Sequence, residues 1–96
     1  SVEDEVIQAA PRMRIAPNPI FGSAELSIDS KVDKPTQVNI YNLKGQMVRE
    51  FTLDSPQTRM VWDTKDDSGI RLSSGIYFIS WKQGSHTGKD KVLIMR

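Results

Sequence analysis

An acidic run in the middle of the chain raises metal binding as the first possible chemistry. Three aspartates fall within residues 63–67, directly before Ser68 and Gly69. An EF-hand calcium loop needs oxygen ligands at its positions 1, 3 and 5, glycine at 6 and glutamate at 12. Counted from Asp63, position 3 is Lys65 and position 6 is Ser68, so the register fails. The run predicts a solvated turn whose aspartates accept backbone hydrogen bonds, and no metal site.

Nucleophilic and acid–base catalysis find no better constellation. The single histidine, His86, sits in a polar loop beside Ser85. A triad needs nucleophile, base and orienting acid within hydrogen-bond reach, whereas neighbouring loop or strand residues point apart. Asp66 and Asp67 lie on a predicted surface turn, where nothing would raise the pKa of one carboxyl group. No cysteine and no phosphate-binding glycine-rich loop are present. We predict a non-catalytic chain without a cofactor.

Composition sets further classes of protein aside. The 96 residues fit one domain, and the net charge is +1 with basic and acidic residues interspersed. Nucleic-acid binding calls for a concentrated basic face, so we predict no nucleic-acid partner. The longest apolar runs have four members, at 76–79 and 92–95. A membrane-spanning helix needs about 20 apolar residues, so none is expected. A secretory signal is not visible at Ser1 and would lie upstream.

Carbohydrate binding stays open as an alternative. Small secreted sandwiches can stack sugars on exposed aromatic rings. Trp62 shares a strand face with Met60, which favours the core, whereas Trp81 could lie on either surface of its sheet. A carbohydrate-binding module would therefore depend chiefly on Trp81.

Alternating apolar and polar residues predict the elements that would position these side chains. Residues 1–11 are acidic and poor in apolar residues, so we interpret them as a linker remnant. From residue 12 to residue 96, short alternating segments are separated by turn residues, and no apolar stripe of helical period occurs. Seven strands without helices indicate an all-β, antiparallel two-sheet sandwich, with a small barrel as runner-up. The expected strands cover residues 12–15, 23–29, 37–41, 47–53, 58–63, 76–82 and 89–96.

Proline and glycine mark the predicted breaks. The prolines at 17 and 19 should end the first strand, because proline offers no N–H to a sheet. Gly45 can take a positive φ in a tight hairpin turn, and residues 83–88 should connect the last two strands. Residues 76–82 are apolar on both faces, which predicts a central strand covered on two sides.

The last strand also carries two apolar faces. Val92 and Ile94 point one way, while Leu93 and Met95 point the other. Such a strand is either buried on both sides or offers one face to a partner, and the residues leave both readings open. The start at Ser1 rather than methionine suggests a terminal module cut from a longer protein.

Five motifs occur in a characteristic order. They are Pro-Asn-Pro at 17–19, the hairpin segment 38–48, Trp-Asp at 62–63, Leu-Ser-Ser-Gly-Ile-Tyr-Phe at 72–78, and a basic-apolar ending at 89–96. Together they resemble the type A C-terminal sorting domain of the type IX (Por) secretion system. The resemblance covers residues 12–96, nearly all of the predicted structured chain.

The resemblance implies an Ig-like β-sandwich appended to a secreted cargo protein of a Gram-negative bacterium. Such domains pass through the periplasm and are recognised by an outer-membrane translocon. They are commonly cleaved by a sortase-like peptidase, which can join the cargo to an anionic lipopolysaccharide at the cell surface. Cleavage here would fall near or before Pro11.

The family's recognition signal carries over to the last two predicted strands. Gly75 would permit the backbone turn into the central strand, and the terminal strand would offer its edge and side chains to a receptor. The residues that the resemblance assigns to translocon recognition are Gly75, Tyr77, Lys89, Lys91, Val92, Leu93, Ile94 and Met95.

A second family shares part of this pattern. Residues 62–78 are also similar to the Ig-like domain of the flagellar hook-capping protein family. A structural role in assembly is therefore the rival to sorting.

Overall fold

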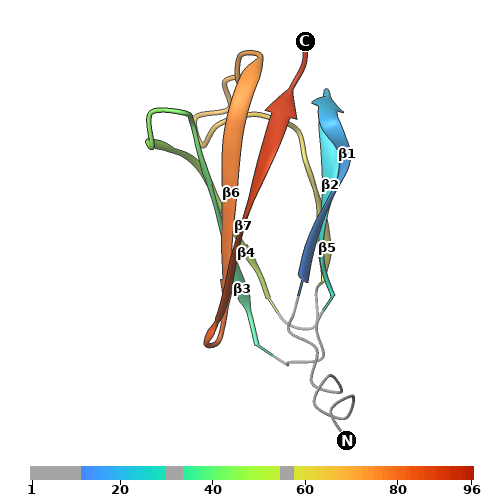
Figure 1. The fold of residues 1–96 in the computed structure, drawn as a ribbon, viewed down its shortest axis with the longest axis vertical. Helices are drawn as coiled ribbons and strands as arrows, with labels where there is room; N and C mark the ends of the chain where they lie inside the picture. Colours follow the sequence, from blue (N-terminus) through green and yellow to red (C-terminus); the bar gives the residue numbers. More distant parts are fainter. Residues whose placement is uncertain (1–11, 30–33, 55–57) are drawn as a thin grey trace, which may run out of the picture.

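The alternating segments form seven strands in the computed structural model, which describes residues 12–29, 34–54 and 58–96. No helix occurs among these residues, and the strands build the expected antiparallel β-sandwich (Figure 1). The predicted linker remnant, residues 1–11, lies outside the described residues, as do parts of the predicted turns at 33–35 and 54–56. The strands are β1 (Arg12–Phe21), β2 (Ser23–Asp29), β3 (Thr36–Tyr41), β4 (Met47–Leu53), β5 (Arg59–Trp62), β6 (Gly75–Gln83) and β7 (His86–Ile94).

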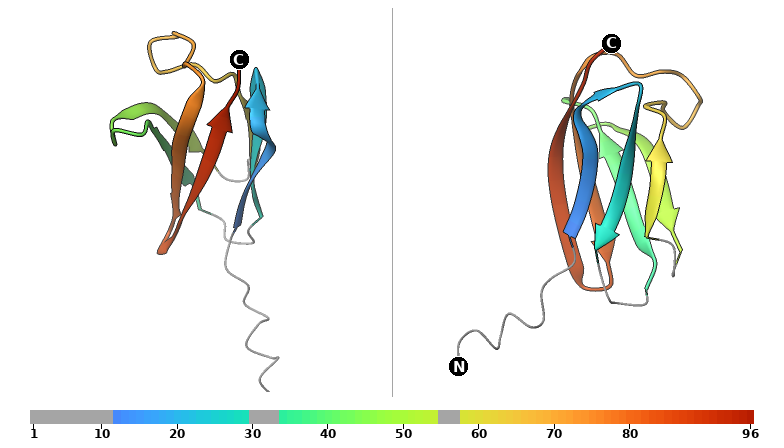
Figure 2. Two further views of the ribbon diagram at one scale, coloured as in Figure 1. Left: turned by 45° about the horizontal axis from the view of Figure 1, so that its top comes forward. Right: turned by 90° about the vertical axis from the view of Figure 1, so that its right-hand side faces the viewer.

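Two layers face each other across one core. One layer is β1-β2-β5 and the other is β4-β3-β6-β7, each with antiparallel neighbours. The right-hand view of Figure 2 looks onto the first layer, with the second behind it. The layers meet in one parallel register pair, Ile20 with Ile94, at the end where β1 and β7 approach each other. The fold is thus a sandwich with a single seam and not a closed barrel.

The core follows from the two-residue period of the strands. In β2, Ala24, Leu26 and Ile28 are buried while the residues between them face outward. The same alternation in the other strands supplies the rest of one hydrophobic cluster between the layers. Its buried members are Met13, Ile20, Ala24, Leu26, Ile28, Val38, Ile40, Leu53, Trp62, Leu72, Tyr77, Ile79, Trp81, Val92 and Ile94.

The first strand does not stop at the prolines as predicted. β1 continues through Pro17 and Pro19 to Phe21, and its pairing with β2 is interrupted between Ala16 and Phe21. Proline cannot donate to a neighbouring strand, so the chain changes partner at this point instead of ending. Residues 12–16 pair with β2, and Ile20 pairs with β7 in the other layer.

The prediction that residues 76–82 are covered on both faces is wrong. β6 lies centrally between β3 and β7, but only Tyr77, Ile79, Trp81 and Gln83 are buried. Ile76 on the opposite face is 37% exposed. A two-layer sandwich gives each sheet one inner face, so the second apolar face of β6 stays on the surface.

Both predicted hairpin turns are present, one of them tighter than expected. Gly45 has a φ of +85°, and its N–H donates to the Asn42 carbonyl at 2.9 Å, as the predicted turn requires. The β6–β7 connection was expected over residues 83–88. Instead, Gln83 already pairs with His86, so the turn is shorter and β7 begins three residues earlier.

Candidate functional site

The acidic run forms a self-contained turn, as predicted. Asp66 Oδ1 accepts hydrogen bonds from the N–H groups of Ser68 and Ile70, both at 2.9 Å. Asp63 Oδ1 accepts from the Lys65 N–H at 3.2 Å. The described part of the chain contains no group of three or more histidine, aspartate or glutamate side chains placed to hold a metal ion.

Arg49 fastens this turn to β4. Its Nη1 donates to the carbonyls of Lys65 at 3.2 Å and Asp66 at 3.0 Å, and its Nε lies 3.6 Å from Asp67 Oδ1. Asp67 Oδ1 also accepts from the Glu50 N–H at 3.3 Å. These side chains are committed to holding the loop, which gives the acidic run a structural function.

Neither tryptophan offers a ring face to a sugar. Trp62 is fully buried, and its Nε1 donates to the Lys65 carbonyl at 3.0 Å. Trp81, on which the carbohydrate-binding alternative chiefly depended, is 6% exposed and belongs to the core. His86 is exposed at the tip of the β6–β7 hairpin, without the enclosure that a catalytic base requires.

The residues assigned to translocon recognition come together on β6 and β7. Register pairs place Gly75 beside Ile94 and Tyr77 beside Val92. Lys91 and Lys89 lie opposite Phe78 and Ser80 one layer outward, and Leu93 lies opposite Ile76. Met95 follows directly after the end of β7. The sequence order therefore becomes one continuous hairpin surface that ends at the C-terminus (Figure 1).

The two faces of this hairpin have different environments. Tyr77, Val92 and Ile94 point into the core and are at most 6% exposed. Leu93 is half-buried on the outer face, where the exposed residues are Lys89, Lys91 and Met95. Only this outer set is accessible to a partner without unfolding the sandwich.

Tyr77 and its neighbours fix the start of β6. The Tyr77 hydroxyl donates to the Ser73 carbonyl at 2.8 Å, four residues upstream. This is the tyrosine corner found at the same place in Ig-type sandwiches. Gly75 has a φ of +153°, which residues with side chains rarely adopt. Ser74 Oγ accepts from the Arg96 N–H at 3.0 Å, which ties the corner to the C-terminus.

Asn18 is a site residue that sequence reasoning missed. Its Nδ2 donates to the Lys91 carbonyl at 3.2 Å, and its Oδ1 accepts from the Leu93 N–H at 3.1 Å. The Ile20 carbonyl then accepts from the Met95 N–H at 2.9 Å. We call Asn18 with its two hydrogen bonds the Asn18 clamp. The Pro-Asn-Pro motif was the available signal, but it was interpreted as a strand end.

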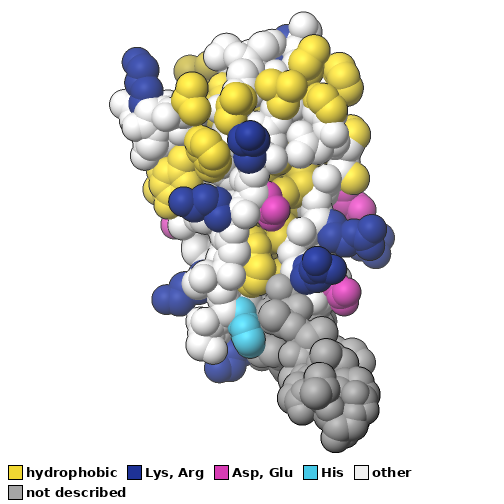
Figure 3. Space-filling model, viewed as in Figure 1, with side chains coloured by type: hydrophobic (Ala, Val, Ile, Leu, Met, Phe, Trp, Pro, Cys, Tyr) yellow, Lys and Arg dark blue, Asp and Glu magenta, His cyan; other side chains and the backbone are white. Residues whose placement is uncertain are grey.

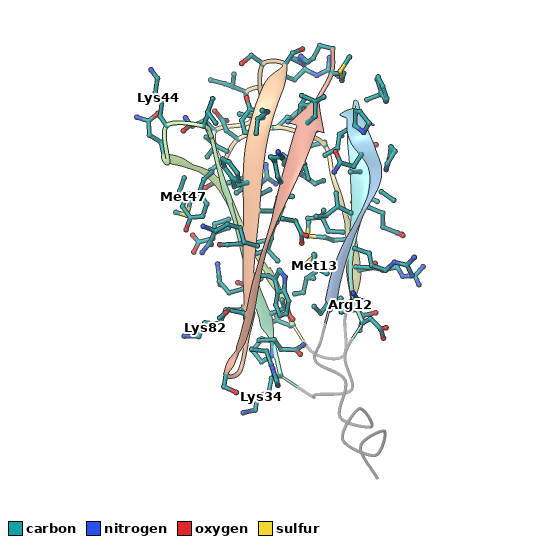
Figure 4. All side chains as sticks on the ribbon, in the orientation of Figure 1. Arg12, Met13, Lys34, Lys44, Met47 and Lys82 are labelled. Atoms are coloured by element: carbon teal, nitrogen blue, oxygen red, sulfur yellow. The ribbon has the colours of Figure 1, made fainter. Side chains whose placement is uncertain are left out.

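An apolar patch covers the outer face of the β4-β3-β6-β7 layer. Figure 3 shows hydrophobic side chains gathered over the upper half of the molecule, with basic side chains spaced among them. Met47 points away from the core on β4 (Figure 4) and is 49% exposed, while Met95 is 42% exposed. Ile76 and Leu93 form a cross-strand pair on the same face.

A two-layer Ig-like sandwich with a tyrosine corner and a structural acidic loop defines a small β-domain of the binding or signalling kind. The family model of the secretion system C-terminal sorting domain matches residues 14–95. The chain belongs to this family. Its sequence likeness is confined to the family level, since no curated protein matches the chain.

Solved structures share the fold. PorZ of Porphyromonas gingivalis, an essential bacterial surface component of the type-IX secretion system, superposes with a TM-score of 0.68 at 17% identity over 88% of this chain. Dimeric latent PorU from the same organism gives 0.67 at 19% over 88%. The DNA glycosylase AlkC of Pseudomonas fluorescens, bound to DNA containing an abasic site analog, gives 0.51 at 12% over 91%. The aligned parts are 11%, 9% and 30% of those chains.

Family membership settles the general function. The domain is a C-terminal sorting signal of type IX secretion, and it belongs to a secreted or cell-surface protein. Sorting domains are non-catalytic as a family. At these identities the solved structures support the fold alone. The described residues include no helix able to cross a membrane.

Proposed function

We propose that this domain directs a cargo protein, attached N-terminally, from the periplasm through the outer-membrane translocon of a Gram-negative bacterium. A sortase-like peptidase then cleaves before the sandwich, and the cargo is attached to the cell surface. The observation that carries the proposal is the convergence of the recognition residues on one hairpin, whose outer face is basic and apolar. The family match places sorting ahead of the hook-capping type of assembly role.

The buried and exposed recognition residues have separate tasks in this proposal. Lys89, Lys91, Leu93 and Met95 contact the receptor, because they face outward. The remaining four hold β7 in place from inside: Gly75, Tyr77, Val92 and Ile94. Loss of a buried member would act through the stability of the strand, and loss of an exposed member would act on recognition directly.

The test is export of the full-length parent protein from its own cell. Deleting residues 92–96 should leave the cargo in the periplasm. Because this deletion also removes buried Val92 and Ile94, which contribute roughly 1.5–3 kcal/mol each, a surface variant is needed beside it. The pair Lys89→Glu and Lys91→Glu should reduce export at an unchanged melting temperature.

Lys44→Glu is the matched control, because Lys44 is exposed in the β3–β4 turn, away from the terminal strand. It should be exported normally. Export undiminished by the deletion would remove the sorting role. Equal loss in the control and in the double variant would show a general charge effect instead of recognition.

A further inference from the structure

The outward edge of β7 is covered along only half of its length. At the C-terminal half, the Asn18 clamp and Ile20 occupy Lys91 O, Leu93 N and Met95 N. The only register pair between β1 and β7 is Ile20 with Ile94. Toward the hairpin tip the two strands diverge (Figures 1 and 2). Among the described residues, no strand therefore pairs with this edge over residues 87–90.

The backbone of the uncovered half is oriented for strand addition. Lys91 O and Leu93 N point away from β6, because both reach Asn18. Backbone direction alternates with a period of two along a strand. The N–H and C=O of Lys89 and the N–H of Lys91 must therefore point outward as well. They form the pattern that an extended peptide recognises when it joins a sheet.

An open cavity of about 580 Å³ adjoins this edge between the two layers. Its lining includes Met13, Trp81, Gly88 and Lys89. Met13 points from β1 toward the space between the layers (Figure 4). Gly88 lies directly opposite Trp81, and a Cβ at Gly88 would collide with the indole nitrogen. The indole can thus reach the edge of the sandwich and form the wall of the cavity.

Charge decides between possible occupants of the edge. Lys89 and Lys91 project from alternate positions of the same strand face. If a second copy paired antiparallel through β7, lysines would lie among lysines, and like charges across a strand pair are destabilising. Lysine on an edge is a common protection against such self-pairing. An acidic strand from another protein would instead meet complementary charges, reinforced at the cavity by Arg12 and Arg14.

We propose that residues 87–91 of β7 take up an extended acidic segment of a partner protein as an additional strand, with one of its side chains entering the cavity beside Trp81. This proposal rests on the proposed function, in which a receptor recognises β7, and it specifies how the backbone is used. The Asn18 clamp restricts the docking segment to the half of the strand nearer the hairpin tip.

The test uses the 96-residue chain and an acetylated, amidated hexapeptide of alternating glutamate and valine, with the lysine–valine hexapeptide as control. Addition of the acidic peptide should slow amide hydrogen exchange at Lys89 and Lys91 and change Trp81 fluorescence. The basic peptide should do neither. Protection centred on Ile76 and Leu93 would place binding on the outer face and overturn strand addition, as would unchanged exchange at saturating acidic peptide.

Two variants separate backbone pairing from charge. Lys89→Pro removes an outward N–H, which an edge position can lose without breaking the β6 ladder. It should weaken peptide binding by about tenfold or more. Lys89→Gln keeps the N–H and should weaken it by less. Equal effects of the two variants would overturn backbone pairing. A concentration-dependent dimer that Lys89→Pro abolishes would identify a second copy as the occupant and also overturn the proposal.

Export of the parent keeps this inference distinct from the sorting role. If deletion of residues 92–96 blocks export while folded Lys89→Pro is exported normally, strand addition is wrong and sorting stands. If neither change affects export, the sorting role itself fails. Should Lys89→Pro not fold, the exchange measurement on the unmodified chain still decides the inference.

Discussion

Single side chains complete the structure where the backbone cannot. Between two prolines, β1 cannot supply the N–H groups that a neighbouring strand needs. The Asn18 amide supplies one donor and one acceptor in their place, matched to Lys91 O and Leu93 N. Asparagine suits this position because its side chain carries both functions in one plane.

Replacing Asn18 tests the clamp. Asn18→Ala removes both hydrogen bonds and should lower the free energy of unfolding by about 1–2 kcal/mol. Asn18→Asp keeps the acceptor for Leu93 N–H but loses the donor, so its loss should be smaller. Urea unfolding measures the stability, and hydrogen exchange at the Leu93 amide reports the strand end. Unchanged exchange at Leu93 in Asn18→Ala would show that the clamp does not hold β7.

Gly88 is defined by the ring opposite it. Gly88→Ala places a methyl group against the Trp81 indole and should cost about 1–3 kcal/mol through overpacking. In the background of Trp81→Phe, which has a smaller ring, the same substitution should cost less. Thermal or urea unfolding of the four proteins gives the coupling energy. Equal costs in both backgrounds would contradict the contact.

At the scale of elements, β1 is the strand that joins the two layers. It pairs with β2 over residues 12–16 and reaches β7 through Ile20. Ile20 is completely buried, whereas its neighbour Phe21 is 65% exposed. The seam between the layers therefore depends on a small part of the strand.

Neighbouring substitutions measure that dependence. Ile20→Ala should lower the free energy of unfolding by about 2–5 kcal/mol, because it leaves a cavity at the seam. Phe21→Ala, one position later, should change it by less than about 0.5 kcal/mol. Chemical unfolding followed by circular dichroism is sufficient. A Phe21 effect as large as that of Ile20 would indicate that the surface side of β1 also contributes to the seam.

Local pattern and long-range pairing were not equally predictable. The strands at residues 23–29 and 47–53 were predicted with the bounds that the structure shows, since alternation is a property of adjacent residues. The sandwich followed from the number of such segments and the lack of a helical period. The clamp did not, because Asn18 meets residues 73 and 75 positions away. For the same reason the sequence left open which surface Trp81 would occupy.

The candidate site divides in the same way. The resemblance assigned its eight residues through motif order, and the structure shows that they share one hairpin. Which of them face a partner depends on the phase of β7 relative to the core, which the alternation of Val92 and Ile94 with Leu93 and Met95 already contained. The coverage of the edge by β1 could be learned only from the fold.

At the scale of the whole molecule, one core is shared by both layers. Trp62 belongs to β5 in one layer and Trp81 to β6 in the other, and both are buried in the same cluster. A small domain with a single core is expected to unfold in one cooperative step.

Single-tryptophan variants test this cooperativity. Trp62→Phe leaves Trp81 as the fluorescent probe, and Trp81→Phe leaves Trp62. In each variant, the fluorescence transition should coincide with the circular dichroism transition of the same protein. A fluorescence midpoint that departs from the dichroism midpoint in either variant would show that the layers separate before the domain unfolds.

The parallel pair of Ile20 and Ile94 joins the first strand of the sandwich to the last. A ribosome must therefore release almost the entire segment before the seam can close. Chains that terminate prematurely would lack the residues that seal it and would present a gaping, protease-sensitive sandwich. Closure of the fold thus doubles as proof that translation reached its end, so that under the sorting role an unfinished polypeptide would lack an intact signal.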